Sequence, residues 1–208
     1  MGLILENVSK TFVSKKAVDG ISFSLNRPQV FGLLGTNGAG KTTTIRMLLG
    51  IIKKDSGEIT WNGKKVDRKS VNFGYLPEER GVYPKVKIYD QLMYFAELKG
   101  MNKQEANNAI QNWAKKLKVE EYMEMPAEKL SKGNQQKIQF MTAVIHNPEL
   151  LVLDEPFSAL DEDLKEDLLR ELKSELQISK PVVFVSHNEE EVSELCDFKY
   201  KIKLGEIV

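Results

Sequence analysis

The chain has 208 residues, and its 30 lysines and arginines balance 30 aspartates and glutamates, so the formal net charge at pH 7 is zero. This length is typical of one domain, or of one domain with a small additional lobe, and a hydrophobic content of 41% indicates a globular core rather than a disordered tail or a fibre. The balanced charge lacks the basic surface that normally marks binding to duplex DNA or RNA, so no nucleic-acid partner is expected.

The N-terminal sequence and the cysteine content predict an intracellular chain. The first residues lack the charged and then apolar layout of a signal peptide, and Cys196 has no second cysteine with which to form an internal disulfide. No segment approaches the roughly 18 uncharged apolar residues that a membrane span needs. Any role at a membrane therefore depends on a partner.

Short apolar segments alternate with longer helical patterns, which is typical of an α/β protein. The expected strands are Leu3 to Val8, Ile21 to Leu25, Val30 to Leu34, Gly57 to Trp61, Asn72 to Leu76, Leu150 to Leu153, Val182 to Val185 and Phe198 to Leu204. The early segments, up to residue 30 and from 57 to 76, are joined by short turns such as Asn62-Gly63 and are expected to be antiparallel. The segments that begin at residues 30, 150 and 182 are each followed by a helical pattern, as parallel strands require.

Residues 88 to 146 are expected to be almost entirely helical. Between Lys103 and Val119 the apolar residues recur with the 3.6-residue period of a helix. They are Ala106, Ala109, Ile110, Trp113, Ala114 and Leu117. We predict a helical subdomain at about residues 85 to 146, inserted in a single domain that covers residues 1 to 208.

A phosphate-binding motif directly follows the strand expected at Val30 to Leu34. Residues 35 to 43 read Gly-Thr-Asn-Gly-Ala-Gly-Lys-Thr-Thr and match G-x-x-x-x-G-K-[ST] between a strand and a helix. The glycines let successive N–H groups converge on an anion, and the helix N-terminus adds its positive dipole. We expect Lys41 to bind the β- and γ-phosphates and the Thr42 hydroxyl to bind Mg²⁺. The residues expected to contact the nucleotide in this loop are Gly35, Asn37, Gly38, Ala39, Gly40, Lys41, Thr42 and Thr43.

Two carboxylates end the apolar segment Leu150 to Leu153. Asp154 and Glu155 precede Pro156, and ligands of parallel sheets bind outside the carboxyl ends of the strands. Asp154 is therefore the expected magnesium partner, directly or through water, and Glu155 is the candidate base that polarises the attacking water. The alternative is that these residues only end a strand and cap a helix; the phosphate loop favours the catalytic interpretation.

A second polar segment precedes the helical pattern from Ile138 to His146. It reads Leu-Ser-Lys-Gly-Asn-Gln-Gln-Lys at residues 130 to 137 and resembles the signature segment of ATP-binding cassette (ABC) ATPases. Ser131 would cap a helix whose free N–H groups, with the small Gly133, form a second anion site. The chain thus carries two expected phosphate sites.

Three further positions extend the resemblance to essentially the whole chain. Residues 158 to 161, Ser-Ala-Leu-Asp, are similar to the family's D-loop, and His187 is similar to its switch histidine. Phe12 stands where the family stacks an aromatic ring on adenine, with packing in the core as the alternative. The resemblance implies an α/β fold of the P-loop NTPase, ABC type, with a mixed sheet, an antiparallel β subdomain and a helical subdomain.

The resemblance also implies an activity and an assembly. ATP and Mg²⁺ would be bound and ATP hydrolysed, with Glu155 and His187 as catalytic residues. Two cassettes would pack head to tail, so that the phosphate loop of one chain and the signature segment of the other enclose one ATP. A single copy of each motif predicts a homodimer or a pair with a sister cassette.

Two positions depart from the usual family pattern. Glu78 stands where the family has a glutamine, and its carboxylate can still meet Mg²⁺ or water. The signature segment has Asn134 in place of the family's glutamine. Both departures resemble the bacterial exporter-type subgroup that works with a separately encoded permease. Many of its members continue beyond the cassette, so a chain ending at Val208 is either a minimal or a shortened member.

The predicted function is the energising subunit of a transporter, cytoplasmic and peripheral on the inner face of the membrane, where it binds an integral membrane permease. One alternative is a non-transport cassette ATPase acting on ribosomes or DNA; such proteins usually carry two cassettes or long coiled coils. Another is a small-molecule kinase, which would leave His187 and the signature segment without a role. The transported substrate is contacted by the permease in this family.

The segment from Glu78 to Gly100 is the expected docking surface for a short helix of the permease. Its aromatic residues are Tyr83, Tyr89, Tyr94 and Phe95, and the alternative is that they form the core of the helical insert. His146 is interpreted as a helix-end residue favoured by the helix dipole, and Cys196 as a packed side chain.

Overall fold

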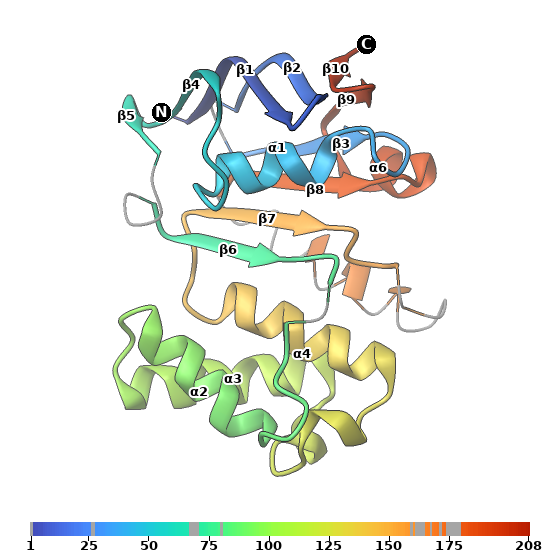
Figure 1. The fold of residues 1–208 in the computed structure, drawn as a ribbon. Coiled ribbons are helices and arrows are strands. Elements are labelled where there is room, and N and C mark those ends of the chain that lie inside the picture. Colours follow the sequence, from blue (N-terminus) through green and yellow to red (C-terminus); the bar gives the residue numbers. More distant parts are fainter. Residues whose placement is uncertain are drawn as a thin grey trace.

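The computed structural model describes residues 2–25, 28–66, 71–79, 81–158, 160, 165–166, 168–170, 172–173 and 180–208. In this part of the chain a four-stranded sheet, a six-stranded sheet and a helical subdomain follow one another from top to bottom of Figure 1. We call the two sheets the antiparallel sheet and the main sheet. The expected α/β fold with an antiparallel and a helical part is confirmed.

The antiparallel sheet has the strand order β2-β1-β4-β5. Its strands are β1 (Leu3–Phe12), β2 (Lys15–Leu25), β4 (Ser56–Trp61) and β5 (Lys64–Lys65). The expected early strands are confirmed, but β1 and β2 extend well beyond their apolar segments into a hairpin whose residues are mostly exposed. Periodicity could not predict this extension, because a strand exposed on both faces has no apolar side to repeat.

The main sheet has the strand order β10-β9-β3-β8-β7-β6. Its strands are β3 (Val30–Leu34), β6 (Phe73–Leu76), β7 (Leu150–Asp154), β8 (Val182–Ser186), β9 (Phe198–Lys203) and β10 (Glu206–Ile207). The expectation that the strand at residues 72 to 76 is antiparallel is wrong, because β6 pairs in parallel with β7, Phe73 facing Leu150. The helical subdomain lies between them in the chain and supplies the long crossover that a parallel pair needs.

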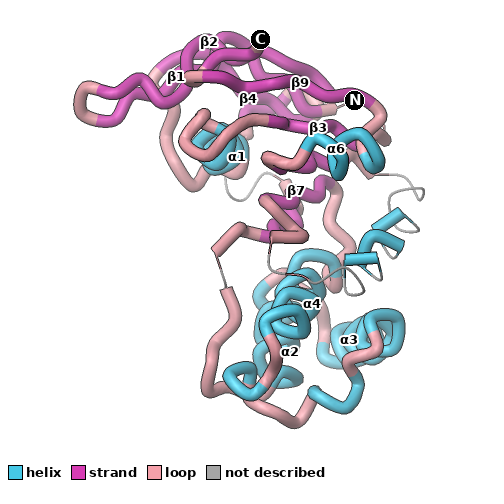
Figure 2. Tube along the Cα trace, turned by 90° about the vertical axis from the view of Figure 1, so that its right-hand side faces the viewer, coloured by secondary structure: helices cyan, strands magenta, loops and turns pink. Residues whose placement is uncertain are grey.

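The main sheet separates two apolar cores. Along β3, Val30 and Leu34 face one core while Phe31 and Leu33 face the other, as the two-residue period of a strand dictates. One core lies against α1 (Lys41–Leu48) and the antiparallel sheet. The other lies against the helical subdomain and α6 (Glu189–Leu195) (Figure 2). Strands β3, β7 and β8 are therefore buried on both faces, and their carboxyl ends open toward one edge.

The helical subdomain contains α2 (Ile88–Leu98), α3 (Lys103–Leu117) and α4 (Lys132–Val144), with single 3₁₀ turns at Glu120–Tyr122 and Ala127–Lys129. Helix α3 begins at a capping box, in which Asn102 accepts from the Glu105 N–H and Glu105 accepts from the Asn102 N–H. Its apolar stripe packs on α4, where the rings of Trp113 and Phe140 meet edge to face at 5.6 Å. No helix in the described ranges is both long and apolar enough to span a bilayer.

Candidate functional site

The loop between β3 and α1 has glycines at two points where the backbone of another segment lies too close for a Cβ atom. Gly40 has φ 110°, and a Cβ there would lie 2.5 Å from the Ala17 carbonyl oxygen. A Cβ on Gly35 would lie 2.6 Å from the carbonyl oxygen of Ile202. The N–H of Gly205 also donates to the Ala39 carbonyl at 2.9 Å. The loop is thus wedged between β2 and the β9–β10 turn.

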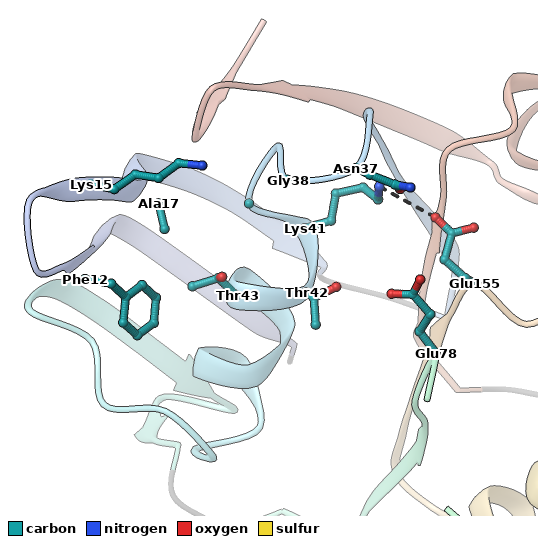
Figure 3. Close-up of a pocket in the computed structure, with 11 residues that line it drawn as sticks. Phe12, Lys15, Ala17, Asn37, Gly38, Lys41, Thr42, Thr43, Glu78 and Glu155 are labelled. Atoms are coloured by element: carbon teal, nitrogen blue, oxygen red, sulfur yellow. Dashed lines mark ion pairs between the residues drawn. The ribbon is translucent and has the colours of Figure 1, made fainter. Parts of the chain in front are cut away.

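A cavity of about 480 Å³ opens in front of this loop (Figure 3). Its lining residues are Phe12, Lys15, Ala17, Asn37, Gly38, Gly40, Lys41, Thr42, Thr43, Glu78 and Glu155. Phe12, at the end of β1, is 44% exposed, so it offers an open ring face beside the loop. Gly35 and Ala39 belong to the loop but not to the cavity wall. Residues far apart in the chain, 12 and 155, are brought to one cavity as the sequence predicts.

Lys41 is buried beneath the loop and is held by the loop's own backbone. Its Nζ donates to the carbonyl oxygens of Gly35 at 2.6 Å and Thr36 at 3.3 Å, and lies 3.6 Å from Glu155 Oε1. Of these partners only Glu155 is charged, so the Lys41 ammonium group could exchange its two carbonyl partners for the oxygens of an anion. An anionic phosphate would therefore be attracted to Lys41 in the cavity.

Asp154, at the end of β7, is fully buried, and neither carboxylate oxygen has a hydrogen-bond partner among the described residues. Burial raises the pKa of Asp154 to about 6; the Thr42 hydroxyl opposes the shift and the charges of Glu78 and Glu155 add to it. A buried carboxylate without a partner is costly. A hard cation that is also bound by a hydroxyl and by phosphate oxygens would supply the missing charge, so these residues fit Mg²⁺.

Glu155 and His187 form a pair at the ends of β7 and β8. Glu155 is 5% exposed, and its Oε2 lies 2.9 Å from Nδ1 of the half-exposed His187. Its N–H donates to the Val185 carbonyl at 2.9 Å, which fixes its unusual φ of 51°. Oε1 has no hydrogen-bond partner in the described part of the chain. Oε1 faces the Lys41 ammonium group at 3.6 Å instead.

A hydrogen-bond and ion-pair network beside this pair was missed in the sequence. The Ser186 hydroxyl lies 2.7 Å from Glu191 Oε2 and 3.3 Å from Glu155 Oε2, and it accepts from the Asn188 N–H at 3.0 Å. Lys165 pairs with Glu191 at 3.3 Å. Ser186 directly precedes His187, so this network orients the backbone that carries the histidine. Only the position of Ser186 at the end of an apolar strand could have indicated it.

The signature segment lies outside the wall of the cavity. Ser131 caps α4 as expected, accepting from the Asn134 N–H at 3.2 Å. Neither Ser131 nor Gly133 is among the described residues that line the cavity. The two expected phosphate sites are therefore separate within one chain. Of the expected D-loop, Ala159 and Asp161 lie outside the described residues.

The interpretation of His146 as a dipole-stabilised cation is wrong. The side chain is buried, its Nε2 donates to the Phe73 carbonyl at 3.0 Å, and burial lowers its pKa to about 4, so the ring is neutral near pH 7. Cys196 packs against Gly32 and Val192, and burial raises the pKa of its thiol to about 12, in agreement with a packing role.

A second cavity, of about 330 Å³, separates β6 from α2 and is lined by Leu49, Ile51, Phe73, Tyr75, Phe95, Leu98, Lys99, Thr142 and His146. Beside it Tyr83 is 49%, Tyr94 52% and Leu98 67% exposed. The alternative that the aromatics of this region are entirely core is therefore wrong, although Tyr89 packs against the core. We call this cavity and its exposed rim the apolar groove.

The family model described as ABC transporter matches residues 18–158. The uncharacterized ABC transporter ATP-binding protein YhaQ of Bacillus subtilis is 51% identical over 94% of this chain and 66% of its own length. The corresponding protein MJ1023 of Methanocaldococcus jannaschii is 46% identical over 98% of this chain and 75% of its own, and the linearmycin resistance ATP-binding protein LnrL of Bacillus subtilis is 35% identical over 98% and 67%. The chain thus spans about two thirds to three quarters of these relatives.

Solved structures share the fold. An ATP-binding subunit of an ABC transporter superposes with a TM-score of 0.90 at 23% identity, over 100% of this chain and 88% of its own. The ADP conformation of MJ1267, an ATP-binding cassette of an ABC transporter, superposes with a TM-score of 0.85 at 23% identity, over 100% and 90%.

The buried carboxyl of Asp154 predicts how stability depends on pH. Its pKa is about 6 in the folded chain against an ordinary 3.8, so the folded state binds this proton more tightly than the unfolded state. The free energy of unfolding should therefore fall as the pH rises from about 4 to about 6, by up to about 3 kcal/mol. Asp154→Asn should remove this fall and raise the ligand-free Tm at pH 7.

Urea unfolding at several pH values, without metal or nucleotide, measures the effect. Asp90→Asn, at an exposed position on α2, is the matched control and should keep the wild-type slope. Identical pH slopes for Asp154→Asn and the wild type would contradict the prediction.

Proposed function

Since the chain belongs to the ABC transporter family, we propose that it binds and hydrolyses ATP and thereby drives a separate membrane permease. The observation that carries the proposal is the convergence of three parts: the phosphate loop in the cavity wall, the buried Asp154 whose carboxylate oxygens have no hydrogen-bond partner among the described residues, and the next residue, Glu155, which also lines the cavity. These parts correspond to phosphate binding, cation binding and activation of water.

ATP would lie along the cavity from Phe12 to Glu155. The exposed ring of Phe12 offers a face for the adenine, and the N–H groups of the loop and of the α1 N-terminus converge on the phosphates. Lys41 would exchange its two backbone carbonyl partners for phosphate oxygens. Mg²⁺ would be held by Thr42 and Asp154, with Glu78 at the cavity edge, and would neutralise charge on the phosphates.

Glu155 would act on the attacking water. Its Oε1 accepts a proton from the water while Oε2 is held by His187 Nδ1, so the carboxylate is oriented before the reaction begins. Burial of Glu155 and the fixed backbone at Val185 limit its reorganisation. His187 is half exposed and can contact the γ-phosphate side of the cavity. This assigns base chemistry to Glu155 and orientation to His187.

The second phosphate site would come from another cassette. Ser131 and Gly133 lie at the start of α4, outside the cavity, which supports a head-to-tail pair in which each ATP contacts the phosphate loop of one chain and the signature segment of the other. The partner cassette is a second copy or a sister chain. Glu78 and the segment Asn134-Gln135-Gln136 support the exporter-type subgroup.

The apolar groove is the proposed contact with the permease. Its rim carries Tyr83, Tyr94 and Leu98, and the rings of Tyr83 and Phe95 stack at 5.9 Å. An exposed apolar surface of this kind is typical of a protein contact. The groove lies next to the segment that carries Glu78, so a cytoplasmic helix of the permease bound there would lie close to the nucleotide. The chain would thus act at the cytoplasmic face of the membrane.

Glu155→Gln should lower kcat by about 10² or more, the scale of a lost positioned base, while ATP affinity changes little. Because ATP is then bound but not hydrolysed, the closed pair should accumulate. ATPase assays and gel filtration with ATP and Mg²⁺ measure both effects. Glu190→Gln, at an exposed position on α6, is the control. A Glu155→Gln chain with normal turnover would disprove the assignment.

Mixing two inactive variants tests the shared site. Lys41→Ala removes the phosphate loop lysine and Ser131→Arg obstructs the signature segment, so each homodimer should be nearly inactive. A mixed dimer contains one intact composite site and one doubly altered site, and ATPase activity should partly return. If no mixing ratio exceeds the single variants, the site is built within one chain.

Leu98→Glu places a charge on the rim of the apolar groove. The side chain is 67% exposed, so the Tm and ATPase activity of the isolated chain should change little, whereas copurification with the proposed permease should be lost. Leu204→Glu is the control, since Leu204 is 83% exposed in the β9–β10 turn, at the opposite edge of the main sheet from β6. Retained copurification of Leu98→Glu would exclude the groove as the contact.

A further inference from the structure

The segment between β6 and α2 connects the nucleotide cavity with the apolar groove. It carries Glu78 at the cavity and Tyr83 at the groove. In Figure 1 the chain descends here from the main sheet to the helical subdomain. Glu78 and Glu79 are exposed, so packing of their own side chains does not hold this part of the chain. Its position depends on its backbone contacts.

Those backbone contacts come from one buried side chain on α4. Gln139 is 2% exposed. Its Nε2 donates to the carbonyl oxygens of Pro77 at 2.9 Å and Glu79 at 3.0 Å, and its Oε1 accepts from the Gly81 N–H at 3.3 Å. A carboxamide has two N–H donors and one carbonyl acceptor. All are used on backbone groups near Glu78: the two carbonyls belong to its direct neighbours, and Gly81 lies three residues further along the chain.

Burial of the Gln139 carboxamide costs free energy. Among the described residues, all of its hydrogen-bond partners lie in this loop. An apolar side chain of the same size would pack equally well among the residues of α4, whereas a buried amide is stable only when its hydrogen bonds are made. Removing it would leave three backbone groups without their partner. The loop would then lose the contacts that fix where the Glu78 carboxylate enters the cavity.

The same helix reaches two other parts of the site. Helix α4 begins at Ser131, two turns before Gln139. Gln136 on α4 donates to the Pro156 carbonyl at 3.0 Å, next to Glu155. One rigid element therefore contacts the signature segment, the chain beside Glu155 and the chain beside Glu78.

We propose that Gln139 is a positioning residue for Glu78: its carboxamide fixes the backbone of Pro77, Glu79 and Gly81 to the helix that begins at the signature segment. The inference rests on the proposed ATP hydrolysis.

The test is a double-mutant cycle on ATP hydrolysis. Gln139→Met keeps length and shape but removes all three hydrogen bonds, and it should lower kcat about tenfold while the KM for ATP changes less than about threefold, because the phosphate loop is untouched. In a Glu78→Gln background the same change should lower kcat by less than about twofold, since Gln139 acts through Glu78.

Two controls keep the cycle interpretable. Gln111→Met, at an exposed position on α3, should leave kcat, KM and Tm unchanged. If Gln139→Met does not fold, Gln139→Glu takes its place, because it keeps the shape and the acceptor for the Gly81 N–H.

The outcomes are distinct. If Gln139→Met lowers kcat equally in the wild type and in the Glu78→Gln background, the positioning role is overturned. A lowered Tm with unchanged kcat would also overturn it. Neither result would contradict the proposed ATP hydrolysis. A wild-type chain that does not hydrolyse ATP, or one whose activity survives Lys41→Ala, would overturn the proposed function and the inference together.

Discussion

The rest of the site depends on two adjacent buried carboxylates at the end of one strand. Asp154 ends β7 and Glu155 follows it; this strand lies between β6 and β8 and is buried on both faces. Negative charge in that position is unfavourable unless positive charge or hydrogen-bond donors approach it. Lys41 comes from the start of α1 and His187 from the end of β8. The carboxyl ends of neighbouring parallel strands are where the fold can bring such groups together.

The parts of the fold that the sequence predicts are those with a period or a motif. Strands β3, β7 and β8 are short continuous apolar runs, and α3 shows a regular apolar stripe. The pattern of apolar residues is therefore enough to predict these elements. The pairing of β6 was mistaken, because the turn at Asn62-Gly63 is a local signal while the partner of β6 lies beyond the helical subdomain, at β7. The residues around a strand contain no pattern that identifies a pairing partner so far away in the sequence.

The site divides in the same way. The phosphate loop, Asp154 and Glu155 could be located because each residue type is tied to a motif or a strand end. Gln139 and Gln136 could not, since they lie on a helix and their partners are backbone groups far along the chain. Any polar side chain can accept or donate to a backbone group, so only the folded geometry reveals which one does. The environment of His146 could not be predicted for a related reason. The sequence indicates the helix end, but not the hydrogen bond from the buried ring to the Phe73 carbonyl.

The wedging of the phosphate loop also has a kinetic consequence. The loop is completed by Ile202 and Gly205 on one side and Ala17 on the other, so its geometry requires contacts between residues more than 160 positions apart. Contacts of such separation form late, after the entropy of closing the intervening chain has been overcome. During synthesis the loop emerges early, but the backbone of Ile202 and Gly205 that shapes it is made more than 160 residues later. A nascent chain therefore exposes its phosphate loop sequence long before it has a phosphate site, and competence for nucleotide arises only with closure of the whole domain.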